Sequence, residues 1–138
     1  MKFELTTVIA CRPEEAFDRM ADARNETRWN SEVSRSELVG NEPVRQGSAF
    51  KTVNRGKEYA ATIQTYERPS RLVFEATGTP MDITISFDFT SEPAGTAVAA
   101  VYEMRPKGFM KAIFPLMAPA MRRDMTEKSR SFKAFCES

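Results

Sequence analysis

The sequence predicts an α+β fold in which a curved antiparallel sheet wraps around a long C-terminal helix, with two short helices after the first strand. Residues 2–11 alternate in side-chain character with the period of a strand. Residues 33–104 form short extended runs separated by turn residues, and the last third changes to a helical period. Because one helix cannot cover such a sheet if it is flat, the sheet is expected to curve around the helix.

The first strand is expected to lead directly into a short helix. Pro13 suits a first helical position, where its missing N–H is not needed, and Glu14 and Glu15 favour the positive end of the helix dipole. A second short helical piece is expected over residues 23–29.

A meander of about six antiparallel strands is expected to follow. Turn signals stand at residues 40–47, 54–56, 67–70, 77–80 and 92–96. The runs between them are rich in β-branched and aromatic residues and are short enough for hairpins.

The C-terminal third carries an apolar stripe typical of one side of a long helix. The stripe consists of Phe109, Ile113, Met117, Met121, Met125, Phe132 and then Phe135 or Cys136. Pro115 and Pro119 remove helical N–H donors, so the first half is expected to be kinked or broken. A firm helix is predicted from about Pro119 to about Phe135.

The composition bounds both the architecture and the chemistry. A chain of 138 residues predicts a single domain over residues 1–138, and its net charge of +1 gives no global attraction for nucleic acid. The chain contains no histidine, and Cys11 and Cys136 are not spaced as a ligand pair, so no metal site and no cofactor are predicted. Both cysteines are expected to be reduced and unpaired in a cytoplasmic protein.

The inner face of the predicted sheet lacks acidic side chains. If Phe87 faces the helix, the period of two turns Asp82 and Asp88 outward, and the same parity turns Glu75 and Glu103 outward on the neighbouring strands. No catalytic residue is therefore assigned, since proton abstraction needs a base held in the cavity.

A ligand cavity is predicted between the inner face of the sheet and the helix. Its expected residues combine inward parity with apolar or adaptable side chains: Trp29, Phe50, Tyr59, Ile63, Phe74, Ile85, Phe87, Ala100, Tyr102, Met117, Met121 and Met125. An ordinary core is the competing interpretation, in which the methionines are packing residues, Tyr102 bonds to backbone or water, and Trp29 packs the short helices onto the sheet.

Five features stand out in this order along the chain: "CRPEEAFDRMADARNETRWN", "VRQGSAF", "ERPSRLVFEA", "AGTAVAAVYEM" and the closing amphipathic helix. In these segments and in the order of its elements, the sequence resembles the START-like or SRPBCC superfamily, in particular its polyketide cyclase/dehydrase and lipid-transport branch. The resemblance implies a helix-grip fold with a cavity for lipids, sterols, polyketides or other apolar ligands. It implies no particular reaction, because members of the superfamily share no universal catalytic residue.

Three functions remain open. The leading hypothesis is a non-catalytic binder or carrier of a hydrophobic small molecule, such as a lipid, a polyketide or an aromatic metabolite. The first alternative is a cyclase-like or dehydrase-like enzyme without metal, in which Tyr59 or Tyr102 orients the substrate. The second is a protein-interaction module, for which an exposed apolar patch would be the sign.

Residues 108–121 have basic flanks that could allow transient contact with a membrane surface. The oligomeric state is left open.

Overall fold

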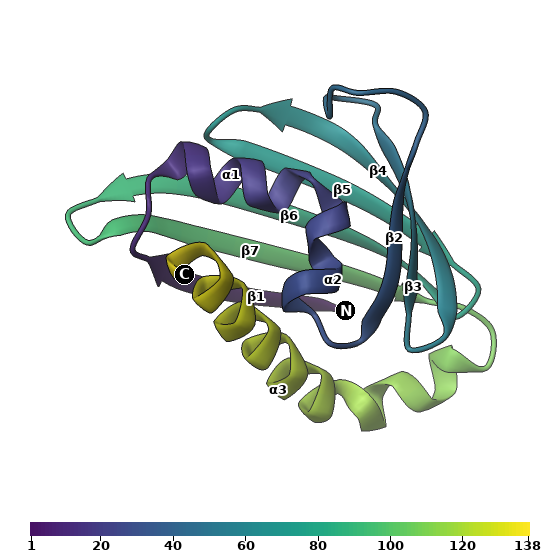
Figure 1. Cartoon of the computed structure of the whole chain (residues 1–138). Coiled ribbons are helices and arrows are strands. Elements are labelled where there is room, and N and C mark those ends of the chain that lie inside the picture. Colours follow the sequence, from purple (N-terminus) through teal and green to yellow (C-terminus); the bar gives the residue numbers. More distant parts are fainter.

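The computed structural model describes all residues from Met1 to Ser138 and confirms the predicted fold class. Seven strands form one antiparallel sheet, which curves beneath the helices (Figure 1). The strands are β1 (Lys2–Ile9), β2 (Val33–Val39), β3 (Ala49–Asn54), β4 (Lys57–Glu67), β5 (Arg71–Gly78), β6 (Met81–Glu92) and β7 (Gly95–Pro106). The helices are α1 (Pro13–Ala21), the 3-10 turn η1 (Ala23–Asn25), α2 (Glu26–Trp29) and α3 (Met110–Glu137).

The sheet has the strand order β1-β7-β6-β5-β4-β3-β2, so β2 to β7 form a meander and β1 joins it beside the last strand. β1 pairs with β7 from Lys2 opposite Glu103 to Ile9 opposite Thr96. The amino group of Met1 also donates to the carbonyl oxygen of Met104, at 2.9 Å. The first and last strands of the chain are therefore neighbours.

The two faces of the sheet differ as the alternation of side chains predicts. Phe74 and Phe87 are buried on the inner, concave face. The acidic residues predicted to point outward form cross-strand ion pairs, with Asp88 bound by Arg71 at 2.9 Å and Glu75 bound by Arg105 at 2.5 Å. Such pairs on a solvated face add modestly to stability and leave the inner surface of these strands free of charge.

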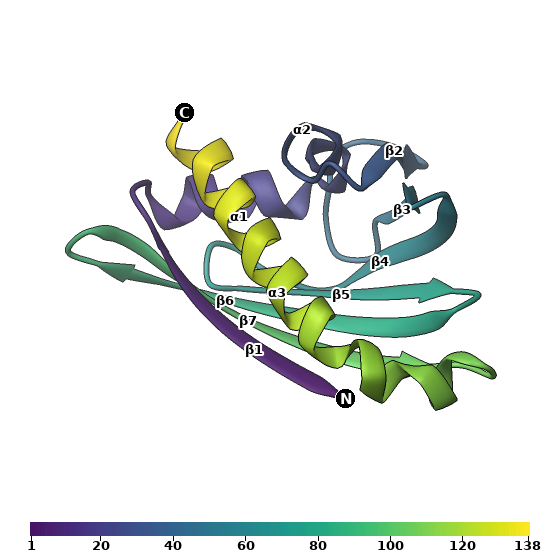
Figure 2. The same ribbon diagram turned by 90° about the horizontal axis from the view of Figure 1, so that it is seen from below.

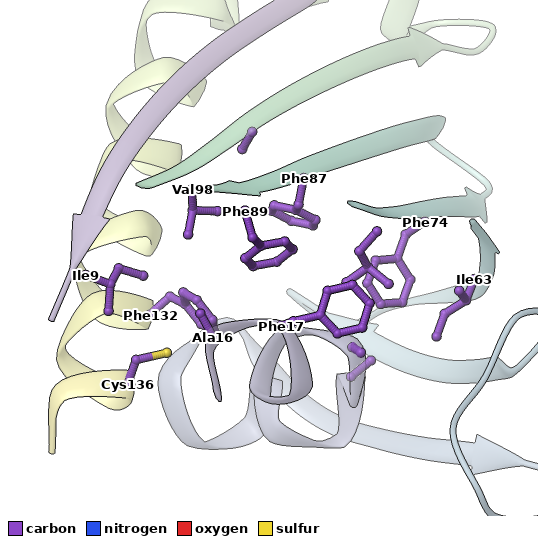
Figure 3. Packing of buried hydrophobic residues seen from close by; sticks show 14 of the residues in the cluster. Ile9, Ala16, Phe17, Ile63, Phe74, Phe87, Phe89, Val98, Phe132 and Cys136 are labelled. Carbon is purple, nitrogen blue, oxygen red and sulfur yellow. The ribbon is translucent and has the colours of Figure 1, made fainter. Parts of the chain in front are cut away.

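Helix α1 closes one end of the concave face. Pro13 occupies its first turn, as predicted, and Ala16, Phe17 and Ala21 are buried beneath it. The ring of Phe17 meets Tyr66 edge to face at 5.0 Å and Phe89 at 5.4 Å, measured between ring centroids. Figure 3 shows Phe17 projecting from α1 toward the aromatic side chains of the sheet.

Helix α3 corrects the predicted start of the C-terminal helix. It begins at Met110 rather than near Pro119, and Pro115 and Pro119 both lie inside it. Its first turns nevertheless lie at an angle to the remainder (Figure 2), as expected where proline removes N–H donors. Most of its length runs along β1, so the helix covers the β1–β7 edge of the sheet rather than its centre.

Two hydrophobic clusters fill the space between the helices and the sheet. The phenylalanine cluster consists of Ile9, Ala16, Phe17, Ala21, Ala23, Phe50, Ala61, Ile63, Leu72, Phe74, Phe87, Phe89, Val98, Ala100, Phe132 and Cys136. The methionine cluster consists of Phe3, Met81, Met104, Phe114 and Met125. Tyr102 packs against both clusters and therefore marks their border.

Candidate functional site

A small cavity lies between β1, β6, β7 and the second half of α3. Its volume is about 30 Å³, which is room for roughly one water molecule. It is lined mainly by apolar side chains: Leu5, Thr7, Ile9, Met20, Trp29, Phe87, Val98, Ala100, Tyr102, Lys128, Ser129 and Phe132. The cavity is thus apolar with a few polar groups at one side, the usual character of a small-molecule site.

The cavity exists because β7 carries a short side chain at a position where both neighbouring strands carry long ones. Ala100 lies directly opposite Leu5 of β1 and directly opposite Phe87 of β6. Neighbouring inward positions on β7 are larger, with Val98 opposite Phe89 and Tyr102 opposite Ile85. Ala100 therefore leaves a gap in an otherwise continuous layer of side chains.

Two aromatic side chains bring hydrogen-bonding groups to this gap. The indole Nε1 of Trp29 is buried without a hydrogen-bond partner, while its ring packs edge to face on Phe132 at 5.3 Å. Burial, and secondarily the carboxylate of Glu26, raises the pKa of Tyr102 to about 12, so this phenol is neutral at physiological pH. Because an unpaired buried N–H is unfavourable, Trp29 is suited to donate to an acceptor placed in the cavity.

A carboxyl group near the cavity comes from a helix, where the sequence analysis did not look for one. Burial raises the pKa of Glu26, on α2, from 4.5 to about 7, against the opposing effects of a hydrogen bond with Asn30 and the charge of Lys128. The prediction that the inward strand positions lack acids holds for the sheet but does not exclude a base near the cavity. Two features of the sequence could have indicated this carboxyl group. Glu26 has the i, i+4 spacing to Asn30 that allows a hydrogen bond within a helix, and Trp29 lies in the same short segment.

An ion network fixes the polar rim of this region. Arg55, in the β3–β4 turn, contacts Glu32 at 2.6 Å and Asp124 at 3.3 Å. Lys128 contacts the same two acids at 2.9 and 3.1 Å. The hydrogen bonds from Arg55 are the main cause that lowers the pKa of Glu32 to about 2. The network ties α3 to the loop before β2 and to the β3–β4 turn.

The structure divides the predicted cavity residues among several places. Trp29, Phe87, Ala100 and Tyr102 line the cavity. Phe50, Ile63 and Phe74 belong to the phenylalanine cluster, with Ile85 packed against it, and Met121 and Met125 belong to or pack on the methionine cluster. Met117 is half-buried on α3, and the ring of Tyr59 covers Gly78, where a β-carbon would overlap it.

Phe50, Ile63 and Phe74 thus lie in a different cluster from Met121 and Met125. The two sets lie in different clusters because α3 follows the β1–β7 edge, while the side chains that pack with Phe50, Ile63 and Phe74 include Phe17 of α1 and Phe132 of α3. The lining residues that sequence reasoning missed come from β1, α1, β7 and the second half of α3. They include Leu5, Met20 and Lys128.

The two cysteines lie side by side although they are far apart in sequence. Cys11 and Cys136 are free thiols in hydrogen-bonding contact, and burial raises the pKa of Cys136 to about 12. The fold brings these two thiols together because the end of β1 and the end of α3 meet, and both are unpaired, as expected. No group of three or more Cys, Asp or Glu side chains lies close enough to hold a metal ion.

The fold and the inner face of the sheet agree with a known family. The family described as polyketide cyclase/dehydrase and lipid transport matches residues 1–137. The chain belongs to this family. It thereby falls within the START-like or SRPBCC superfamily, as the resemblance implied. No curated protein sequence matches the chain closely enough to indicate a relative.

Solved structures share the fold at low sequence identity. TTHA0849 from Thermus thermophilus is 17% identical with a TM-score of 0.78, over 99% of this chain and 97% of that one. The di-domain ARO/CYC StfQ from the steffimycin biosynthetic pathway is 15% identical with a TM-score of 0.76, over 99% of this chain and 50% of that one. Ara h 8.0201 is 10% identical with a TM-score of 0.72, over 99% and 97%. These likenesses support the helix-grip fold and not a particular ligand.

Proposed function

We propose that the protein binds a hydrophobic small molecule that carries a hydrogen-bond acceptor, with its apolar part at Ala100 and its acceptor facing Trp29 and Tyr102. The observation that carries this proposal is the buried, unpartnered Nε1 of Trp29 beside an apolar gap. A buried N–H without an acceptor destabilises a core that holds no ligand, whereas the carbonyl oxygen of a bound ligand would accept its hydrogen bond. The family, whose description includes polyketide cyclases and lipid transport, supports a ligand of this class.

Binding requires the cavity to expand. Its volume of about 30 Å³ is far below the ~300 to 1,000 Å³ of typical ligand pockets. The border at Tyr102 gives the direction of expansion, because beyond it lie Met104 and Met125. Methionine side chains are unbranched and flexible, so they can be displaced at lower energetic cost than the rings of the phenylalanine cluster.

A pair of matched probes tests this proposal. 2-Acetylnaphthalene and 2-ethylnaphthalene share their apolar skeleton, but only the first carries a carbonyl. We expect the acetyl compound to bind more tightly in a fluorescence titration. Trp29→Phe should abolish this preference, because it keeps an aromatic side chain at this position but removes the N–H donor. Equal affinity of both compounds for the wild type would contradict the polar half of the proposal.

A second pair of variants tests the position of the apolar half. Ala100→Val adds two carbons to the gap and should weaken binding of both probes. Ala99→Val is the matched control, since the neighbouring residue points to the opposite face of β7. If the two variants bind the probes alike, the ligand does not lie at Ala100.

A second candidate function is proton transfer, and Glu26 is the observation that favours it. A carboxyl group with a pKa near 7 can both accept and return a proton at physiological pH. In this reaction its carboxylate removes a proton from the carbon next to a ligand carbonyl. The electron pair moves onto the carbonyl oxygen, which Trp29 and Tyr102 hold by hydrogen bonds. StfQ, which shares the fold, belongs to a biosynthetic pathway, and this similarity keeps the enzyme hypothesis open.

Hydrogen exchange separates a carrier from an enzyme. In D₂O, catalysis by Glu26 would accelerate loss of the acetyl methyl proton signal of 2-acetylnaphthalene, followed by NMR. Glu26→Gln should then bind the probe but lose the acceleration. Exchange at the uncatalysed rate with the wild type, together with normal binding, supports the carrier alone.

A further inference from the structure

The first half of α3, residues 110–123, has an exposed face unlike the rest of the surface. Phe109, just before the helix, is 78% exposed, and Leu116 is 84% exposed, the two highest values among the large exposed hydrophobic side chains. Between them and just beyond, the exposed positions of this half are Lys111, Ala112, Pro115, Pro119, Ala120, Arg122 and Arg123. We call Phe109 together with the exposed positions of this half the basic apolar face.

The charge on this face has one sign. No Asp or Glu occurs between Glu103 and Asp124, while the basic residues in this interval are Arg105, which pairs with Glu75, and Lys107, Lys111, Arg122 and Arg123. Lys107 is paired with Asp82 at 2.8 Å, and the guanidinium of Arg122 lies over the ring of Phe3 at 5.0 Å. No ion pair engages Lys111 or Arg123, both of which are exposed, and the adjacent Asp124 pairs with Arg55 and Lys128 instead.

The opposite side of the same helical segment is also apolar. Phe114 is buried in the methionine cluster, and Ala118 and Met121 pack against it. When a helical segment is apolar on both sides, packing on the sheet buries only one of them. The other side stays exposed and has no partner within the chain. By contrast, the exposed face of residues 124–137 carries Glu127, Arg130 and Glu137, which is the usual polar pattern of a surface helix.

We propose that the basic apolar face docks onto an anionic lipid bilayer surface. No helix combines the length and the apolarity needed to cross a bilayer. Exposed Phe and Leu side chains beside unpaired Lys and Arg are the features of a helix that lies in the membrane interface, where the rings enter the acyl boundary and the cations meet anionic headgroups. The face carries positive charge without intervening acids, so two copies of this face would repel each other. The charge therefore favours an anionic bilayer over a second copy of this chain as the partner.

This inference goes beyond the proposed ligand binding and does not rest on it. Residues on the inner side of the same helical half pack into the methionine cluster, so a membrane that engages the outer side would approach the part of the core proposed to expand. Ligand binding in solution and docking on lipid can therefore be measured separately, and either can fail alone.

Vesicle flotation tests the docking. The wild-type protein should float with vesicles of phosphatidylcholine mixed with phosphatidylglycerol, much less with phosphatidylcholine alone, and less again at high salt. Phe109→Ser/Leu116→Ser should lose binding to both. Lys111→Glu/Arg123→Glu should weaken binding to the anionic vesicles by about tenfold or more, the loss expected when surface cations near anionic lipid are reversed.

Matched controls carry the same chemical changes elsewhere. Val39→Ser removes an exposed apolar side chain at the far edge of the sheet, and Lys51→Glu/Lys57→Glu reverses two exposed cations on β3 and β4. Both controls should float like the wild type. The urea denaturation curve without vesicles should be nearly unchanged in the Phe109→Ser/Leu116→Ser variant, which shows that the fold is intact whether or not the probes bind.

Three results would overturn the proposal. These are absence of flotation with anionic vesicles, equal losses in the control variants, and dimerisation of the wild type without lipid that disappears in Phe109→Ser/Leu116→Ser. The last result would assign the face to a second copy of the chain.

Discussion

The two halves of α3 are one continuous helix, yet they are held in different ways. Residues 124–137 insert Phe132 and Cys136 into the phenylalanine cluster and join the ion network through Asp124 and Lys128. Residues 110–123 bury Phe114 among methionines, contain two prolines and expose an apolar face. The second half is fixed by side chains of defined shape and charge, whereas the first half is held by side chains that can rearrange.

This difference assigns separate tasks to the two ends of the concave surface. The end covered by α1 and the second half of α3 maintains the fold, because ring-to-ring contacts and a multi-residue ion network have one good geometry. The methionine end tolerates displacement, because thioether side chains fill irregular spaces at little energetic cost. The cavity lies near their border, at Ala100 and Tyr102.

The largest expected effect compares two buried phenylalanines, one in each half. Phe132 is 3% exposed and Phe114 is 1% exposed, so burial alone predicts similar losses. We expect Phe132→Ala to lower the free energy of unfolding by ~3 to 5 kcal/mol, and Phe114→Ala to lower it by at least ~1 kcal/mol less, because methionines can collapse into the space. Urea denaturation measures both. Equal losses would remove the distinction between the halves.

The next effect concerns the buried acid that faces the second half. Because the pKa of Glu26 is raised to about 7, the folded protein keeps a proton that the unfolded chain has lost between pH ~4.5 and ~7. The free energy of unfolding should therefore fall as pH rises through this window. Lys128 and Tyr102 face Glu26, and Tyr102 remains neutral throughout because its pKa is about 12.

Glu26→Gln should remove this decrease and be more stable than the wild type by roughly 1 to 3 kcal/mol at pH 8, with little difference near pH 4.5. Chemical denaturation at both pH values provides the measurement. Asp18→Asn, at an exposed acid of α1, is the comparison variant and should leave the decrease in place. If the free energy of unfolding depends on pH in the same way for Glu26→Gln and the wild type, the carboxyl of Glu26 is solvated in the folded protein.

A smaller effect is expected from the ion network. Since the pKa of Glu32 is lowered to about 2, its stabilisation is complete above pH ~4.5 and is lost as pH falls toward 2. Glu32→Gln should cost about 1 kcal/mol at pH 7, because Arg55 is largely exposed and solvent screens the pair. Glu127→Gln breaks the exposed pair with Arg130 and should change stability by less than ~0.5 kcal/mol. A thermal melt in which both variants behave alike would contradict a clamping role for the network.

The smallest effect is expected on the outer side of the first half. Leu116→Ser should change the free energy of unfolding by no more than ~0.5 kcal/mol, because this side chain is 84% exposed. Met125→Ser, on the inner side of the helix, should be several times more costly, since it places a hydroxyl in the methionine cluster. Denaturation in the absence of lipid tests this pair, and a large loss for Leu116→Ser would mean that its side chain is covered in solution.

The parts of the fold that depend on local pattern could be predicted from the sequence. The period of two placed Phe74, Phe87 and Tyr102 on the inner face, and Pro13 marked the start of α1. The path of α3 over the sheet could not be predicted, because periodicity fixes which face of a helix is apolar but not which strands receive it. For this reason the residues assigned to one pocket separate into two clusters.

The missed site residues have a related cause. Glu26 lies on a half-buried position of a four-residue helix, and the charge of Lys128 acts on its carboxyl because α2 and α3 are in contact. A sequence shows no such approach between segments about a hundred residues apart. The start of α3 was missed because Pro115 and Pro119 argue against a helix locally, whereas burial of Phe114 and Met125 favours its continuation.

The pairing of β1 with β7 also sets the order in which the protein can fold during synthesis. Lys2 leaves the ribosome long before its partner Glu103, which is not available until nearly the whole sheet has been made. The hairpins from β2 to β6 can form as they emerge, because each pairs with the strand made just before it. Until β7 has been made, β1 has no strand to pair with, and Phe3 and Ile9, which the fold buries, stay exposed. Such long sequence separation slows folding and lengthens the time during which an unpaired strand is open to chaperones or to aggregation.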